Sequence, residues 1–139
     1  MTFPTNDYNT ELIEKFRANN GVMPGGSQLL LLTTTGAKSQ KLRVNPLAFT
    51  RDGDRYVIIA SKGGSPTNPD WYHNLVANPE VTVEVDGKRF AARAAVTEGE
   101  ERQKLFDAQA AAMPNFAEYQ TRTSRRLPVV VLEPINSSN

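Results

Sequence analysis

The chain has 139 residues, no cysteine and one histidine, and its formal net charge at pH 7 is +1. This length suits one domain with one core, and the absence of cysteine excludes disulfides, thiolate metal sites and cysteine nucleophiles. A net charge near zero argues against a nucleic-acid-binding protein held by bulk electrostatics, and a single histidine excludes a metal site built from several histidines.

The first part of the chain is expected to lie outside the main domain. Residues 1–26 are predicted to form an N-terminal segment with one short helix over Glu11–Asn19, and residues 27–139 a single β domain. The apolar side chains of this helix share one face, for which packing on the core is favoured over a membrane anchor. Because the sequence shows no signal-peptide pattern and no apolar run long enough to cross a bilayer, it predicts a soluble cytoplasmic protein.

A turn rich in hydroxyls and cations, residues 33–43, lies between two apolar runs that are expected to be strands. Its cations are Lys38, Lys41 and Arg43. No acidic residue occurs from residue 15 to residue 51, and Gly36 stands where the backbone is expected to bend sharply. Lys and Arg donors and turn amides form strong hydrogen bonds to anionic oxygens, so the turn predicts a phosphate or carboxylate site. An ordinary solvated hairpin is the alternative.

A second loop, residues 60–66, contains two glycines that would let a ligand approach the backbone closely. Ser61 and Lys62 add hydrogen-bond donors to it. If the strands on either side of the tight turn at 51–54 are antiparallel neighbours, Arg43 and Lys62 lie at the same edge of the sheet. The cations Lys38, Arg43 and Lys62 are therefore predicted to converge on one anion with no carboxylate between them. A flexible loop without a ligand is the alternative.

A first helix is expected after this loop, from Thr67 or Asn68 as its N-cap to Ala77. Within it, Trp71 taken alone is more often a core anchor than a surface for a ligand. His73 is expected to have a surface or packing role, because no partner for acid–base chemistry is evident nearby.

A second helix is expected from Thr97, as its N-cap, to about Ala112. Three glutamates in its first turn suit the helix dipole. Pro114 breaks the helix, and Asn115–Thr121 are predicted to continue as a short third helix.

Six strands are predicted from apolar and β-branched runs. They are Gln28–Thr34, Arg43–Thr50, Arg55–Ser61, Val81–Val85, Lys88–Val96 and Leu127–Leu132. Turns at 51–54 and at Asp86–Gly87 join two pairs of these strands as hairpins, with glycine able to adopt positive φ. This pattern predicts a mainly β protein, a small and mostly antiparallel β-barrel with peripheral helices.

No nucleophile, metal-ligand set or acid–base pair is evident in the sequence. If the protein is an enzyme, a bound cofactor is therefore expected to carry the reaction, with the protein binding and orienting it.

Five motifs, in this order, resemble the deazaflavin-dependent nitroreductase family of actinobacteria. They are Leu30–Ser39, Arg43–Leu47, Ala60–Gly64, Asn68–Leu75 and Ala77–Pro79. Members of that family are F420H2-dependent quinone and nitro reductases with a split β-barrel related to FMN-binding, pyridoxamine-oxidase-like barrels. The resemblance runs from about residue 29 to residue 134 and implies an FMN-binding split-barrel-like fold.

The resemblance implies coenzyme F420, a deazaflavin with an anionic phosphate and polyglutamate tail, as the cofactor. Its groove would be lined by Ala37, Lys38, Ser39, Arg43, Val44, Asn45, Pro46, Leu47, Ala48, Ile59, Ala60, Ser61, Lys62, Asp70, Trp71, Tyr72, His73 and Asn74. Lys38, Arg43 and Lys62 would hold the tail. Asn45, Ser61 and the backbone around Ala60 would meet the ring.

The implied reaction is hydride transfer from reduced F420 to a quinone, or to an activated alkene or nitro compound. Ser61 and Tyr119 would be the catalytic donors that polarise the acceptor. Ala48, Met113, Phe116 and Tyr119 would bind the acceptor. Tyrosine can stand at the first three of these positions in relatives, so turnover of bulky nitroaromatic prodrugs is not favoured. A barrel that binds F420 or another anionic amphiphile without turnover, and an FMN-dependent barrel oxidoreductase, are the alternatives.

Overall fold

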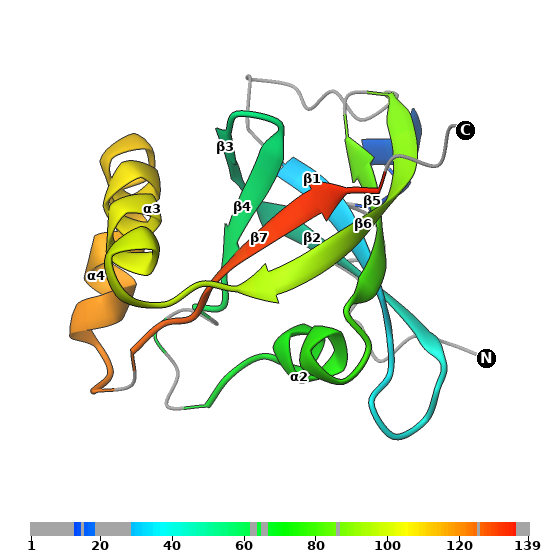
Figure 1. Ribbon diagram of the computed structural model, residues 1–139, viewed down its shortest axis with the longest axis horizontal. Coiled ribbons are helices and arrows are strands. Elements are labelled where there is room, and N and C mark those ends of the chain that lie inside the picture. Colours follow the sequence, from blue (N-terminus) through cyan, green and yellow to red (C-terminus); the bar gives the residue numbers. More distant parts are fainter. Residues whose placement is uncertain are drawn as a thin grey trace.

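The computed structural model describes residues 13–14, 16–18, 29–61, 64, 67–85, 87–124 and 126–135. In this part of the chain, seven antiparallel strands form one sheet that curls into a half-barrel (Figure 1). The strands are β1 Leu29–Thr35, β2 Leu42–Ala48, β3 Thr50–Asp52, β4 Arg55–Ile59, β5 Glu80–Val85, β6 Lys88–Val96 and β7 Val129–Pro134. Their order across the sheet is β2-β1-β5-β6-β7-β4-β3. The predicted mainly β fold with peripheral helices is confirmed.

The two edge strands of this sheet, β2 and β3, follow one another in the chain with only Phe49 between them. Phe49 turns into the core, where its ring centroid lies 5.4 Å from that of Tyr56. Because the chain crosses here from one edge of the sheet to the other, the single strand expected over 43–50 is two strands. β2 pairs with β1, and only β3 pairs with β4 around Gly53, whose φ is 62°. The expectation that the whole of 43–50 pairs with β4 is therefore wrong.

Strands β4 and β7 are buried on both faces. Along β4, Tyr56 and Ile58 face the barrel interior, while Val57 and Ile59 belong to a second apolar cluster on the outer face. The strand β7 alternates in the same way. The helices α3, Gly99–Ala112, and α4, Asn115–Thr121, supply the rest of the outer cluster and lie beside the sheet at the left of Figure 1. Burial on both faces explains why these strands read as continuous apolar runs in the sequence.

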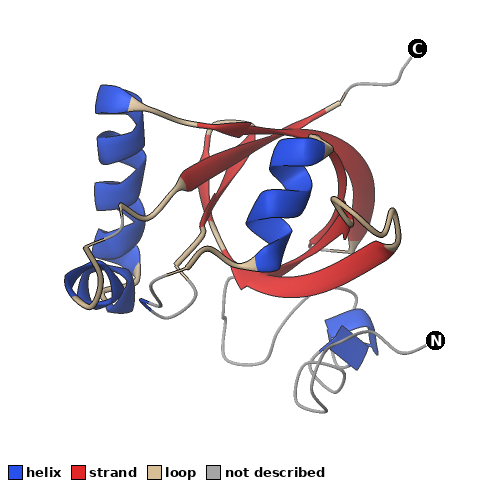
Figure 2. Cartoon of the chain, turned by 90° about the horizontal axis from the view of Figure 1, so that it is seen from below, coloured by secondary structure: helices blue, strands red, loops and turns tan. Residues whose placement is uncertain are grey.

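The helix α2, Asp70–Ala77, lies across the opening of the curled sheet (Figure 2). Trp71 and Leu75, one turn apart, are buried in the barrel core. The predicted N-caps of α2 are wrong, because the N-cap is Pro69 and its side chain makes no cap bond. Because Trp71 and Leu75 point into the barrel core, the face of α2 that lies toward the turn after β1 is formed by other residues.

The helix α3 begins one residue later than a Thr97 cap would require, with Glu98 as its N-cap. The Thr97 hydroxyl instead donates to the Val129 carbonyl at 2.8 Å, which ties the end of β6 to β7. The predicted N-cap is therefore wrong, because the Thr97 hydroxyl is engaged by the Val129 carbonyl of β7.

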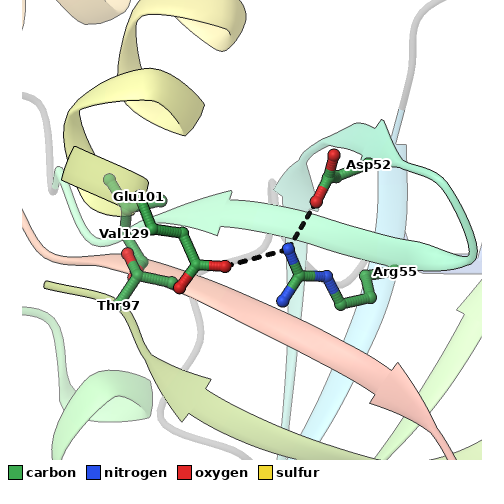
Figure 3. Close-up of polar contacts among 5 residues, drawn as sticks. All are labelled: Asp52, Arg55, Thr97, Glu101 and Val129. Carbon is green, nitrogen blue, oxygen red and sulfur yellow. Dashed lines mark hydrogen bonds and ion pairs between the residues drawn. The ribbon is translucent and has the colours of Figure 1, made fainter.

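Arg55 joins the β3–β4 hairpin to α3 (Figure 3). Its Nη2 donates to the Asp52 carboxylate and, at 3.1 Å, to the Glu101 carboxylate. These hydrogen bonds raise the pKa of Arg55 above its usual value. A second link, in which the Thr50 hydroxyl donates to Gln109 Oε1 at 3.0 Å, lies further along α3. The two links hold α3 against the hairpin and so place α4, which follows it.

The predicted N-terminal helix lies only partly within the described residues, of which 13–14 and 16–18 are helical. Phe16 is buried, and the Arg17 guanidinium makes two hydrogen bonds to the Glu84 carboxylate on β5, at 2.9 and 3.1 Å. None of the described helices is long and apolar enough to cross a membrane.

Candidate functional site

A cavity of about 640 Å³ lies between the turn after β1, the first residues of β2 and one face of α2. Its lining residues are Gly36, Ala37, Lys38, Ser39, Arg43, Val44, Asn45, Asp70, His73 and Asn74. Asp70, His73 and Asn74 share a helix face because they stand at i, i+3 and i+4. The volume falls within the range of roughly 300–1,000 Å³ that is usual for small-molecule sites.

The turn between β1 and β2 is closed by its own backbone. The Gly36 amide donates to the Lys41 carbonyl at 2.7 Å, and the Gln40 amide donates to the Gly36 carbonyl at 3.0 Å. The residue of this turn with positive φ is Gln40, at 60°, and not Gly36, where the sharp bend was expected. A Cβ on Gly36 would displace the Ser39 hydroxyl. That hydroxyl accepts from the Lys41 amide at 3.2 Å.

Asn74 fastens this turn to α2. Its Oδ1 accepts from the Ala37 amide at 3.0 Å, and its Nδ2 donates to the Thr34 hydroxyl at 3.1 Å. Asn78, one turn further along, donates to the Thr35 carbonyl at 3.3 Å. The side chains of Asn74 and Thr34 are buried. The position of the cationic turn is thus set by a buried amide on a helix that the barrel core itself holds in place.

The cavity presents two cations and one carboxylate. Lys38 is exposed, whereas Arg43 is half-buried and its Nη1 is fully buried without a hydrogen-bond partner among the described residues. Asp70 lines the same cavity from α2, as the resemblance implied, so a carboxylate stands near the cations that the turn itself supplies without one. No salt bridge joins Asp70 to either cation in the part of the chain that the structure describes. A buried guanidinium nitrogen without an acceptor is costly, and an anionic oxygen bound in the cavity would satisfy it.

Nine cofactor residues expected from the resemblance line this cavity together. They are Ala37, Lys38, Ser39, Arg43, Val44, Asn45, Asp70, His73 and Asn74. Lys62 lies outside the described residues, so the expected convergence is seen only for Lys38 and Arg43.

The remaining expected cofactor residues lie elsewhere. Trp71 is part of the barrel core, and Tyr72 packs against that core and lines a different cavity. Pro46, Leu47 and Ala48 continue along β2. Ile59, Ala60 and Ser61 form the buried end of β4 and the residues after it.

The four residues expected to bind the acceptor come together in the outer apolar cluster. Phe116 is a buried member of this cluster. Ala48, Met113 and Tyr119 are partly buried and pack against the cluster. Ala48 lies on β2, five residues beyond Arg43, which corresponds to about 17 Å along an extended strand. One edge strand therefore leads from the cationic cavity to this cluster.

Ser61 and Tyr119 belong to segments that touch through Gly64. The Gly64 amide donates to the Ser61 carbonyl at 2.9 Å, and a Cβ on Gly64 would lie 2.8 Å from the Tyr119 carbonyl. Its φ of 83° also favours glycine. The sequence predicted that a ligand approaches the backbone of this glycine loop closely. In the structure, α4 makes a close approach to the loop at Gly64.

The hydrogen bond between Thr34 and Asn74 is the contact of this site that the sequence did not predict. Three consecutive threonines end the otherwise apolar strand β1, and Thr34 is buried there like its apolar neighbours. A hydroxyl at a buried strand position needs a polar partner. This pattern was the available signal for the bond to Asn74.

Comparison with known proteins adds an independent line of argument. The sequence profile of the family described as F420H(2)-dependent quinone reductase matches residues 7–134. An F420H(2)-dependent quinone reductase of Mycobacterium tuberculosis is 44% identical over 124 residues, which cover 84% of this chain and 83% of that protein. A Mycobacterium bovis protein named as a putative F420H(2)-dependent quinone reductase shows the same identity and coverage.

Solved structures agree with this assignment. An F420-H2 dependent reductase of known structure, FDR-A, is 44% identical in sequence to this chain. The match covers 76% of this chain and 93% of FDR-A, with a TM-score of 0.70. A haem-storage protein of Vibrio cholerae, 17% identical with a TM-score of 0.59, shares the fold alone. The profile match, the close relatives and the shared split β-barrel place this chain in the F420H2-dependent quinone reductase family.

Proposed function

We propose that this protein uses reduced coenzyme F420 to reduce a quinone, with activated alkenes and nitro compounds as further acceptors of the same kind. The observation that carries the proposal is that the strand β2 runs from the cationic cavity to the apolar cluster around Ala48. An elongated cofactor with an anionic tail and an apolar ring system matches a site that is cationic at one end and apolar at the other.

The cationic end is suited to the cofactor tail. Arg43 offers a buried Nη1 that lacks an acceptor, and Lys38 offers an exposed ammonium at the rim of the same cavity. Phosphate and carboxylate oxygens accept strong hydrogen bonds from such donors. Asp70, which lines the same cavity, limits how many negative charges the cavity accepts. We expect the phosphate near Arg43, and the more distant carboxylates of the tail nearer Lys38 and solvent.

At the apolar end, the chain orients the ring and the acceptor. When bound, reduced F420 supplies a hydride. Ala48 presents only a small side chain on β2, and Phe116 and Met113 give apolar walls that exclude water. Tyr119 Oη accepts a hydrogen bond from Asn115 Nδ2 at 3.1 Å and donates none to another described residue. The Tyr119 hydroxyl proton is therefore available to an acceptor oxygen on which charge builds.

The proposal is tested by titrating the protein with F420 while following the fluorescence of Trp71, the only tryptophan. Trp71 is the neighbour of Asp70 in the cavity wall, so saturable quenching by F420 and none by FMN is expected. Oxidation of reduced F420 by menadione, recorded anaerobically, should then depend on the protein. Quenching without oxidation would favour a non-catalytic carrier, and a response to FMN alone would favour a flavin enzyme.

Replacing Tyr119 by phenylalanine should lower kcat for menadione roughly 10- to 100-fold, because a donor to the developing charge is lost. The KM for reduced F420 should stay unchanged, since Tyr119 lies in the acceptor cluster and not in the cationic cavity. Steady-state kinetics in both substrates measure the two constants. Tyr72→Phe removes the same hydroxyl from a residue outside both regions and serves as the control. Equal kcat in wild type and Tyr119→Phe would remove Tyr119 from the proposed mechanism.

A further inference from the structure

A second cavity, of about 300 Å³, lies between α2 and the beginning of α3. Its lining residues are Tyr72, Val96, Thr97, Glu98, Gly99, Arg102, Arg126, Leu127 and Pro128. It shares no lining residue with the cavity at the β1–β2 turn. The proposed reductase chemistry therefore makes no use of it.

Arg102 is the unusual residue of this cavity. It is only 6% exposed, yet its guanidinium makes no salt bridge with any described carboxylate. Its hydrogen bonds go to neutral oxygens instead. Nε and Nη2 both donate to the Leu127 carbonyl, at 3.3 and 2.7 Å. Nη2 also donates to Gln120 Oε1 at 3.2 Å, and Nη1 donates to Gln103 Oε1 at 3.1 Å.

These bonds leave one donor of Arg102 unused. A guanidinium carries five N–H groups, and four hydrogen bonds are made, so one N–H of Nη1 has no acceptor among the described residues. One face of the guanidinium is covered by the Phe106 ring, whose centroid lies 4.7 Å from Cζ. Burial lowers the pKa of Arg102, and the charge of Arg126 lowers it further. A buried cation in this position is stabilised by a bound anion.

Arg126 places a second cation at the same cavity. Its side chain is exposed and makes no hydrogen bond or ion pair with another described residue. Glu98 is the one carboxylate in the lining, so the lining side chains carry two positive charges and one negative charge. This balance matches a single negative charge, whereas Glu98 would repel a dianion such as phosphate.

The remaining walls are apolar or aromatic. Val96, Leu127 and Pro128 supply hydrocarbon surface, and Tyr72 supplies an aromatic ring from α2. A cavity of this volume stands at the lower end of the range for small-molecule sites, about 300 Å³, and so suits a ligand of one ring. We propose that the cavity formed by Arg102, Arg126 and these walls binds a small monocarboxylate with a flat apolar body, of the size of benzoate.

The test is a calorimetric titration of the Arg43→Gln variant with benzoate, since that substitution weakens anion binding in the first cavity. Saturable binding is expected, with benzamide, the neutral isostere, at least about tenfold weaker because it lacks the charge that the arginines attract. Inorganic phosphate should also bind at least about tenfold more weakly, because its second charge is uncompensated.

Adding Arg126→Gln should weaken benzoate binding about fivefold or more, and adding Arg93→Gln should leave it unchanged. Arg93 is an exposed residue of β6 outside both cavities, so it controls for the overall charge of the protein. Arg102→Lys keeps the buried charge but loses the guanidinium geometry, and should also weaken benzoate binding.

Equal binding of benzoate and benzamide, equal effects of Arg126→Gln and Arg93→Gln, or no saturable binding would each overturn the proposal. F420 binding by the single variant Arg126→Gln should match that of the wild type. The reductase proposal and the proposed second site are therefore tested by separate measurements.

Discussion

Replacing Arg43 by glutamine is expected to weaken F420 binding by about 1.5–3 kcal/mol, the usual contribution of a hydrogen bond to a charged group. The half-buried guanidinium lies in the wall of the first cavity, and its Nη1 is buried without a protein acceptor. A ligand oxygen there makes a contact shielded from water, so its loss is costly. The dissociation constant from Trp71 fluorescence measures this effect.

The same substitution should leave the free energy of unfolding of the ligand-free protein within about 0.5 kcal/mol of wild type. No hydrogen bond of Nη1 to a described residue is lost when Arg43 is replaced. Lys38→Gln should weaken F420 binding by less, about 0.2–1 kcal/mol, and added salt should reduce that smaller effect, because Lys38 is exposed. Arg93→Gln is the control for net charge. Unchanged affinity in both cavity variants would contradict the assignment of the anion site.

Replacing Asn74 by leucine is expected to lower the free energy of unfolding by about 1–3 kcal/mol, because the buried Thr34 hydroxyl loses its partner. F420 affinity should fall as well, since the Ala37 amide is released and the cationic turn is no longer held to α2. Urea unfolding and the fluorescence titration measure the two effects separately.

The variant Asn74→Asp separates the structural effect from the electrostatic one. A carboxylate still accepts from the Ala37 amide, and the Thr34 hydroxyl is able to rotate and donate to it. This variant should therefore retain more stability than Asn74→Leu. Its added negative charge faces the anion site, so F420 should bind at least as weakly as in the leucine variant. Wild-type affinity in both variants would show that the turn needs no support from α2.

Local sequence patterns predicted much of this molecule. The strand Lys88–Val96 and the helix Asn115–Thr121 have the bounds that their residues indicated. Period-2 alternation and breaker residues act within a few positions of one another, so they are readable without knowledge of the fold. The cationic turn was readable for the same reason, since its cations and glycine lie within eight residues, from 36 to 43.

Contacts between distant segments could not be read in the same way. Asp70 enters the cation-lined cavity from α2, and Asn74 reaches across to Thr34, forty residues away in the chain. The break at Phe49 depends on how strongly the whole sheet curls, which no single strand specifies. Local patterns therefore brought Lys38 and Arg43 together, whereas Asp70 and Asn74 were named only through the resemblance. The hydrogen bond from Asn74 to Thr34 was not predicted.

By itself the sequence determined most of the strands, the cationic turn and the kinship with F420-dependent reductases, because these depend on local periodicity and on motifs in a fixed order. Tertiary structure alone decided that α2 closes the barrel end, that Arg43 is left with a buried nitrogen lacking an acceptor, and that Arg102 is buried beside a second cavity. Burial and hydrogen-bond satisfaction are properties of the packed chain. They arise only when the curled sheet brings its edges and helices together.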